Sequence, residues 1–262
     1  MISVEHVSKS FGTRQILRDV SLSVGKGETM VILGASGSGK STLLKMIIGL
    51  LRPDSGRVMV NGQDITRMNE DELNRERIHM GMVFQYSALF DSMSVRENVA
   101  FGLHQHGHFS EEEIDSIVRE KLHLVGLDGT ESLMPASLSG GMKKRVSLAR
   151  AIALNPEIIL YDEPTAGLDP IRSTDISALI KRTQETMHVT SVVVTHDLKS
   201  AYYVADRIAF LYKGQFRFIG RPEEIRNSDD PTVQQFIQGK GSLEEEAHAG
   251  GGTEWDGQQK LK

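Results

Sequence analysis

Gly34-Ala35-Ser36-Gly37-Ser38-Gly39-Lys40-Ser41 is the stretch that decides the fold of this 262-residue chain. It matches the pattern G-x-x-x-x-G-K-[ST] and lies between the apolar run Met30 to Leu33 and a helix predicted from Lys40 to about Leu51. Glycines let the backbone curl so that successive N–H groups point inward, and the helix start adds its positive dipole end. The pattern therefore predicts a phosphate-binding loop, because a chance glycine-rich turn would not explain the strand and helix on either side.

Two acidic residues, Asp162 and Glu163, follow the second apolar run, Ile158 to Tyr161. Adjacent strand residues project to opposite sides, so the two carboxylates can have different roles at the end of the strand. We expect Asp162 to join the Mg²⁺ shell and Glu163 to orient or deprotonate the attacking water. Without the phosphate loop, a solvated turn would be the better interpretation of an acidic strand end.

The composition is that of an ordinary globular protein, with 39% apolar and 25% charged residues. The absence of cysteine excludes disulfides and thiol chemistry, and the net charge of −5 gives no attraction to nucleic acid. No apolar run approaches the ~20 residues that span a bilayer, and the N-terminus lacks the features of a signal peptide. We therefore expect a cytoplasmic protein that does not cross the membrane.

The hydrophobic pattern predicts an α/β fold. Residues 1 to about 30 alternate like an antiparallel sheet, whereas residues from about 86 to 156 have a mostly helical period. Asn61-Gly62 predicts the bend of a hairpin. The remaining predicted segments are a helix from Glu111 to Val125, hairpin strands over Arg57 to Ile65, parallel strands at Ile158 to Tyr161 and Thr190 to Thr195, and a pair formed by Arg207 to Tyr212 and Gln215 to Ile219.

Two further segments have competing interpretations. The glycine- and glutamate-rich residues 239–262 predict a flexible tail, but the presence of Trp255 also suits a segment that docks on a partner or sister subunit. His104, His106 and His108 alternate in a way that a metal site could use. A solvated loop is the simpler interpretation of the three histidines.

Leu138-Ser139-Gly140-Gly141 resembles the signature that distinguishes ATP-binding-cassette ATPases from other P-loop ATPases. Taken alone, the segment could be a glycine hinge at a helix start, with Ser139 as its cap. The resemblance implies a P-loop NTPase domain over residues 1–238, with a RecA-like parallel-sheet core and an N-terminal antiparallel β subdomain. An inserted helical subdomain is expected at about 87–156.

The resemblance also implies a set of site residues. Phe11 would stack on adenine, Gln85 would be the Q-loop glutamine, Ala166 to Asp169 the D-loop and His196 the H-loop histidine. The implied catalytic residues are Lys40, Gln85, Glu163 and His196; those for Mg²⁺ are Ser41, Gln85 and Asp162; those for ATP are Phe11, Gly34, Ala35, Ser36, Gly37, Ser38, Gly39, Lys40, Ser41, Thr42, Ser139, Gly140 and Gly141. Family members pack head to tail, so the signature would act in trans within a homodimer.

Two strings, Leu138 to Arg145 and Gly81 to Asp91, resemble the ATPases of Mla phospholipid transporters. This implies transport of phospholipid between the inner and outer membranes of a Gram-negative-type envelope, powered from the cytoplasmic face of the inner membrane. The implied partners are a multispanning permease, an Mce-domain lipid-binding protein and a small cytoplasmic accessory subunit, with no nucleic acid. Met142 departs from the usual glutamine of the signature, which puts a side-chain hydrogen bond near the nucleotide in doubt but leaves the backbone contacts.

Other functions remain open on the sequence alone. The chain could serve an importer of a small solute such as an amino acid, or be a cassette ATPase acting on ribosomes or DNA. A small-molecule phosphotransferase would leave the signature unexplained. The apolar residues between Ser87 and Leu103 fit either a core or a groove that receives a permease helix.

Overall fold

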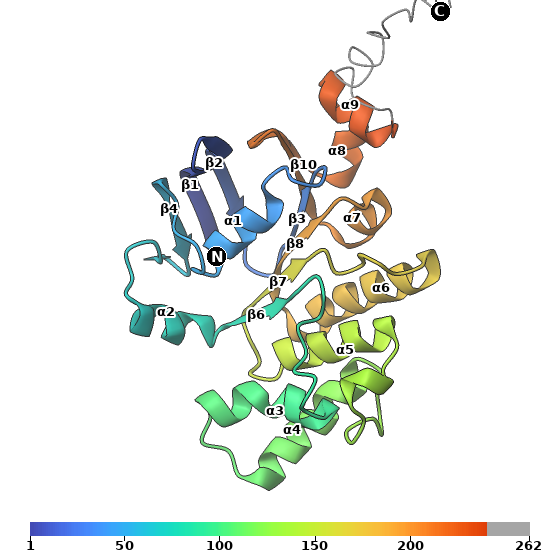
Figure 1. The fold of residues 1–262 in the computed structure, drawn as a ribbon. Helices are drawn as coiled ribbons and strands as arrows, with labels where there is room; N and C mark the ends of the chain where they lie inside the picture. Colours follow the sequence, from blue (N-terminus) through green and yellow to red (C-terminus); the bar gives the residue numbers. More distant parts are fainter. Residues whose placement is uncertain (240–262) are drawn as a thin grey trace, which may run out of the picture.

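The computed structural model describes residues 1–239, which contain a six-stranded sheet with the predicted parallel core (Figure 1). Its strand order is β10-β9-β3-β8-β7-β6. All neighbours are parallel except β10, which pairs antiparallel with β9. The bounds are β3 (Thr29–Leu33), β6 (Met80–Val83), β7 (Ile158–Asp162), β8 (Thr190–Thr195), β9 (Arg207–Tyr212) and β10 (Gln215–Gly220). The α/β prediction is confirmed.

A second, antiparallel sheet has the order β2-β1-β4-β5. It consists of β1 (Ile2–Phe11), β2 (Arg14–Val24), β4 (Ser55–Val60) and β5 (Gln63–Asp64). The structure confirms both the predicted N-terminal antiparallel strands and the hairpin bent at Asn61-Gly62.

Helices cover the strands and form most of the chain between β6 and β7. Their bounds are α1 (Lys40–Ile47), α2 (Glu70–Arg77), α3 (Val95–His106), α4 (Glu111–Leu124), α5 (Gly140–Ala151), α6 (Pro170–Met187), α7 (Leu198–Val204), α8 (Pro222–Arg226) and α9 (Pro231–Ile237). Helices α2, α3 and α4 begin with capping boxes, which satisfy backbone N–H groups at their starts. The predicted helical stretch is confirmed by α3, α4 and α5, while its limits as a subdomain stay a prediction.

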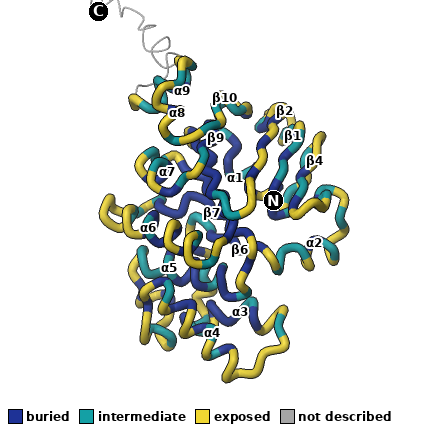
Figure 2. The backbone as a smooth tube through the Cα atoms, turned by 180° about the vertical axis from the view of Figure 1, so that it is seen from behind, coloured by how far each residue is buried: buried dark blue, intermediate teal, exposed yellow. Residues whose placement is uncertain are grey.

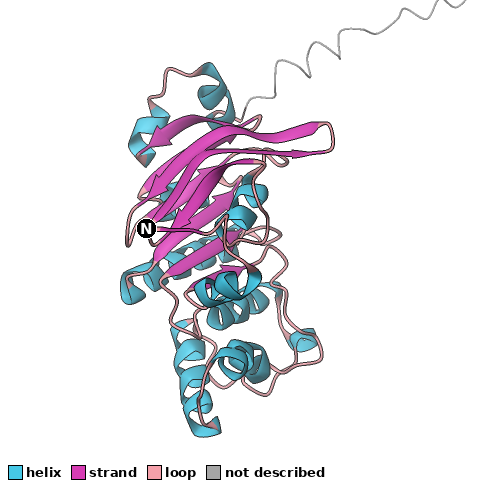
Figure 3. Cartoon of the chain, turned by 90° about the vertical axis from the view of Figure 1, so that its left-hand side faces the viewer, coloured by secondary structure: helices cyan, strands magenta, loops and turns pink. Residues whose placement is uncertain are grey.

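The six-stranded sheet separates two apolar cores. In β3, Met30 and Ile32 face one core, while Val31 and Leu33 face the other. The first core includes α1 and the antiparallel sheet, so α1 is packed between the two sheets. The second core joins the opposite face to helices α3 to α7. Figure 2 shows the buried central strands, and Figure 3 shows the strands gathered at the end opposite helices α3 and α4.

Several boundaries differ from the sequence expectations. Helix α1 ends at Ile47 and not at about Leu51, because Gly49 adopts a left-handed conformation (φ 74°) and the N–H groups of Leu50 and Leu51 turn back to the Lys45 carbonyl. Strand β6 and helices α2, α6, α7, α8 and α9 were not predicted. The proposed tail, with Trp255, lies outside the described residues apart from Gly239.

The alternating histidines do not all lie in a loop, since His104 and His106 belong to the last turn of α3. Within residues 1–239, no group of three or more His, Cys, Asp or Glu side chains is arranged to hold a metal ion. In the same part of the chain, no helix has the length and apolar character needed to cross a bilayer.

We expect Gly81→Ala to destabilise the fold by about 2–3 kcal/mol, because overpacking a close contact forces the backbone to shift. A Cβ atom at Gly81 in β6 would lie 2.4 Å from the backbone oxygen of Ala151 in α5. Urea unfolding followed by circular dichroism would measure the change. Gly102→Ala is the control, since its Cβ would meet only the flexible end of Leu154 at 3.3 Å. Equal stability of Gly81→Ala and the wild type would contradict this contact.

Candidate functional site

The phosphate loop curls between β3 and α1 with the geometry expected of it. Gly37 (φ 76°) and Gly39 (φ 108°) take conformations that side chains disfavour, and Gly39 occupies the N-cap of α1 without a side-chain cap bond. A Cβ atom at Gly34 would lie 2.3 Å from the Leu211 backbone oxygen, so glycine is required where the loop leaves the sheet. Lys40 Nζ donates to the Gly34 and Ala35 carbonyls, at 2.8 and 3.1 Å. The lysine amine is thereby held at the mouth of the loop.

Ser41 and Asp162 meet although 121 residues separate them in the chain. Ser41 Oγ donates to Asp162 Oδ1 at 2.8 Å. Ser41 lies in the first turn of α1, and Asp162 is the last residue of β7. A hydroxyl and a carboxylate side by side provide the oxygen ligands that Mg²⁺ prefers. The residue types and their placement fit the predicted metal position.

Glu163 is held in a strained backbone conformation beside Lys40 and His196. Its φ is 46°, which is uncommon for a residue other than glycine and places the carboxylate back toward the loop. Glu163 Oε1 lies 3.3 Å from Lys40 Nζ, and Oε2 lies 2.9 Å from His196 Nδ1. Oε2 also accepts a bond from the His196 backbone N–H at 3.3 Å. The structure thus brings three of the predicted catalytic side chains into one cluster.

Phe11 lies at the rim of a hollow that adjoins the phosphate loop. Its side chain is exposed, which leaves a ring face free for stacking. The hollow is lined by Phe11, Arg14, Ile16, Gly37, Gly39, Lys40, Ser41 and Thr42. Arg14 and Ile16 were not predicted from the sequence, although their place after the β1–β2 turn that follows Phe11 was a usable signal.

Gln85 lies two residues beyond β6, at the sheet edge where β7 also ends. Val83 pairs with Tyr161, so the continuation of β6 runs past Asp162.

The signature segment lies at the start of α5, away from this chain's own phosphate loop. Ser139 caps α5 and is exposed, and a Cβ atom at Gly140 or Gly141 would contact Leu168 or Arg172, respectively, at 3.7 Å. No residue of the signature lines the hollow beside this chain's own phosphate loop.

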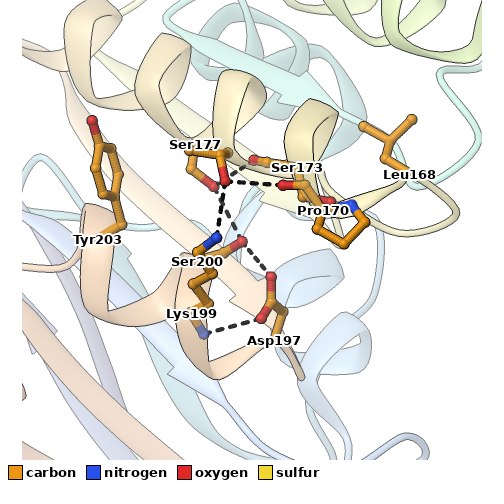
Figure 4. Close-up of a pocket in the computed structure, with 9 residues that line it drawn as sticks. Leu168, Pro170, Ser173, Ser177, Asp197, Lys199, Ser200 and Tyr203 are labelled. Atoms are coloured by element: carbon orange, nitrogen blue, oxygen red, sulfur yellow. Dashed lines mark hydrogen bonds between the residues drawn. The ribbon is translucent and has the colours of Figure 1, made fainter.

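A crevice between α6 and α7 is lined by Leu168 of the predicted D-loop and by Asp197, the residue after His196 of the predicted H-loop (Figure 4). Ser177 of α6 donates to Ser200 Oγ of α7 at 3.1 Å, and Ser200 donates to Asp197 at 2.5 Å. Asp169 caps α6, and its backbone bonds, above all that from Arg172, lower the pKa of its carboxyl group. Because Asp197 directly follows His196, the serine pair links the histidine loop to the helix that follows the predicted D-loop.

Residues between Ser87 and Leu103 serve both as core and as groove. Val95, Val99 and Leu103 are fully buried, whereas Phe90 and Phe101 line an open groove with their ring centroids 4.7 Å apart. The groove continues over β6 and α5 through Met82, Arg150 and Leu154, among others. Core and groove therefore lie on different faces of the same segment, and a permease helix in the groove stays a prediction.

Comparisons with known proteins agree with this geometry. A family model described as "ABC transporter" matches residues 17–166. The chain is 43% identical to the intermembrane phospholipid transport system ATP-binding protein MlaF of Haemophilus influenzae, over 92% of this chain and 91% of that protein. It is 44% identical to the probable ribonucleotide transport ATP-binding protein mkl of Mycobacterium leprae, over 91% of this chain and 69% of that one.

Among solved structures, the chain resembles the ATP-binding cassette MJ0796, described as a dimer in a post-hydrolysis state bound to ADP and Pi. The TM-score is 0.78 and the identity 35%, with 85% of this chain and 99% of that chain covered. The family match spans more than half of the sequence, and the fold and phosphate loop agree with it. The chain therefore belongs to the ABC transporter family, as an ATPase that binds and hydrolyses ATP to drive transport.

Proposed function

We propose that this ATPase powers phospholipid transport across a bacterial envelope, and that the cluster of Lys40, Ser41, Asp162, Glu163 and His196 hydrolyses MgATP. The cluster carries the hydrolysis proposal because one small region holds a cation for the phosphates, oxygens for a metal and a carboxylate for water. The similarity to MlaF over nearly the full length of both chains supports the choice of phospholipid.

Mg²⁺ would be held by Ser41, Asp162 and Gln85, whose oxygens suit this cation. When bound, it neutralises charge on the β- and γ-phosphates. The chain's own residues account for the rest of the site. Lys40 binds the phosphate oxygens, Phe11 stacks on adenine, and Gly34 to Thr42 surround the phosphates with N–H groups and hydroxyls.

Glu163 is placed to accept a proton from the attacking water or to orient it. His196 lies against the same carboxylate, through both its ring and its backbone N–H. We infer that His196 keeps Glu163 in a single orientation and itself faces the γ-phosphate. The left-handed backbone at Glu163 supports this role, because such strain is concentrated at functional sites.

A homodimer would complete the site, with Ser139, Gly140 and Gly141 of one subunit closing over the phosphate loop of the other. The exposed start of α5 supports this arrangement, because its N–H groups are open to an anion from another chain. The solved relative is likewise described as a dimer.

The groove at Phe90 and Phe101 would receive a helix of a multispanning permease at the cytoplasmic face of the inner membrane. An Mce-domain lipid-binding protein and a small cytoplasmic subunit would complete the transporter. The second candidate function is import of a small solute; the similarity to a probable ribonucleotide transport protein supports a small solute as the substrate.

Glu163→Gln is expected to lower ATP turnover at least about a hundredfold, because the water loses its base while the phosphate loop stays intact. ATP binding should persist, and the variant should form a stable dimer with ATP, detectable by size-exclusion chromatography. Glu157→Gln, an exposed change just before β7, is the matched control. Turnover of Glu163→Gln at the wild-type rate would refute the assignment.

Ser139→Arg should abolish turnover but leave ATP binding by the isolated subunit within about twofold, because the signature acts on the partner's nucleotide. Fluorescent-nucleotide binding and phosphate release measure the two effects. The change also removes a helix cap, worth about 1 kcal/mol, so the thermal midpoint must be checked. Ser116→Arg on α4 is the exposed control. Unchanged hydrolysis by Ser139→Arg would contradict a site shared between subunits.

Purification from native membranes tests the transported substrate. We expect a multispanning membrane protein and enriched phospholipid to accompany the ATPase, both identified by mass spectrometry. A permease with a small-solute receptor and no enriched lipid would favour the second candidate. Recovery with ribosomes and no membrane protein would overturn the transport assignment of this chain.

A further inference from the structure

Helix α5 presents two basic side chains to the loop that contains Gln85. We call residues 84–91 the Gln85 loop. Lys144 Nζ donates a hydrogen bond to the Gln85 backbone oxygen. Arg150 donates to the Ala88 and Ser87 backbone oxygens, at 2.7 and 3.0 Å. Two basic side chains of one helix thus hold three backbone oxygens of this loop, those of Gln85, Ser87 and Ala88.

The Gln85 loop has a conformation that needs such support. Ser87 (φ 62°) and Ala88 (φ 46°) are both left-handed, and each such residue other than glycine costs on the order of 1 kcal/mol. The far end of the loop is fixed from α3, where buried Asn98 bonds both the N–H and the C=O of Phe90, at 2.9 and 3.1 Å. The loop is therefore held at Gln85 from α5 and at Phe90 from α3.

Lys144 is an unusual choice for its position. Its side chain is only 6% exposed, and among residues 1–239 no carboxylate lies within ion-pair distance of it. Burial lowers the pKa of Lys144, and the negative charges of Asp162 and Glu163 act against that shift. An apolar side chain would fill the space without the desolvation cost of a buried amine. Within residues 1–239, the hydrogen-bond acceptor of this amine is the Gln85 backbone oxygen, which gives the buried amine a structural role.

We propose that Lys144 is a positioning residue that fixes Gln85 at the sheet edge beside Asp162 and sets the rate of ATP hydrolysis through that glutamine. The inference rests on the role proposed above for Gln85. Lys144 touches the Gln85 backbone, so the glutamine side chain stays free to face the metal and water. The same helix begins at Ser139, so the amine also ties the Gln85 loop to the signature segment.

A double-mutant cycle tests this inference. Lys144→Met is expected to lower kcat about tenfold and to change KM for ATP less than twofold, since Phe11 and the phosphate loop are untouched. The Mg²⁺ concentration for half-maximal turnover should rise several-fold. In a Gln85→Ala background, Lys144→Met should cause no further loss of kcat, because Lys144 acts through Gln85. A general weakening of α5 would instead lower turnover in both backgrounds.

Two further variants make the test independent of folding defects. Lys144→Arg should retain turnover within about threefold, because a guanidinium can also donate to the Gln85 oxygen. Lys181→Met on α6, which removes an exposed lysine, should behave like the wild type. Amide hydrogen exchange of residues 84–91 should become about tenfold faster in Lys144→Met and remain unchanged in the Arg variant.

Each outcome separates the two proposals. If Gln85→Ala impairs turnover while Lys144→Met does not, the inference about Lys144 fails and the role of Gln85 survives. Additive losses in the double variant would also overturn the inference. If Gln85→Ala turns over like the wild type, the proposed role of Gln85 fails, and any loss in Lys144→Met must then arise by another route.

Discussion

The hydrogen bond from Ser41 to Asp162 joins the first turn of α1 to the end of β7, and the nucleotide site is built around this junction. It requires β3, β8 and β7 to be parallel and to end at one edge, because only then do α1 and the end of β7 meet. Parallel strands in the middle of a sheet are covered on both faces and must be apolar on both. Strands β3, β7 and β8 are accordingly buried along their whole length. The antiparallel sheet and the helices supply the two cores that cover these faces.

Buried charge is the second constraint on the site. Lys40 is 5% exposed and Glu163 10% exposed at the side chain, so neither ion is fully hydrated by solvent. Each is compensated by the other and by fixed partners, which for Lys40 are the loop carbonyls and for Glu163 the groups of His196. Burying these two charges costs desolvation free energy. In return, the site holds charges that are already oriented toward the phosphate and the water.

The parts of the fold that could be predicted from sequence are those with strong local signals. The phosphate loop, the apolar strands and the capped α4 carry such signals, and the structure confirms these elements. Strand β6 was not predicted, because Gly81 interrupts a short apolar run and is needed for contact with α5. No role for Lys144 or Arg150 was predicted from the sequence. Their contacts with the Gln85 loop, 59 to 63 residues away, depend on tertiary packing that no local pattern specifies.

The position of α5 supports the proposal that one chain holds only part of a nucleotide site. The helix is pinned near its end by the close approach of Ala151 to Gly81 in β6, and along its length by Lys144 and Arg150. Its signature end lies beside Leu168 and Arg172 and lines no part of the hollow at the phosphate loop. A helix held at so many points could not swing across to its own loop without breaking these contacts. If the N–H groups at the start of α5 bind phosphate, that phosphate must belong to nucleotide held by another subunit.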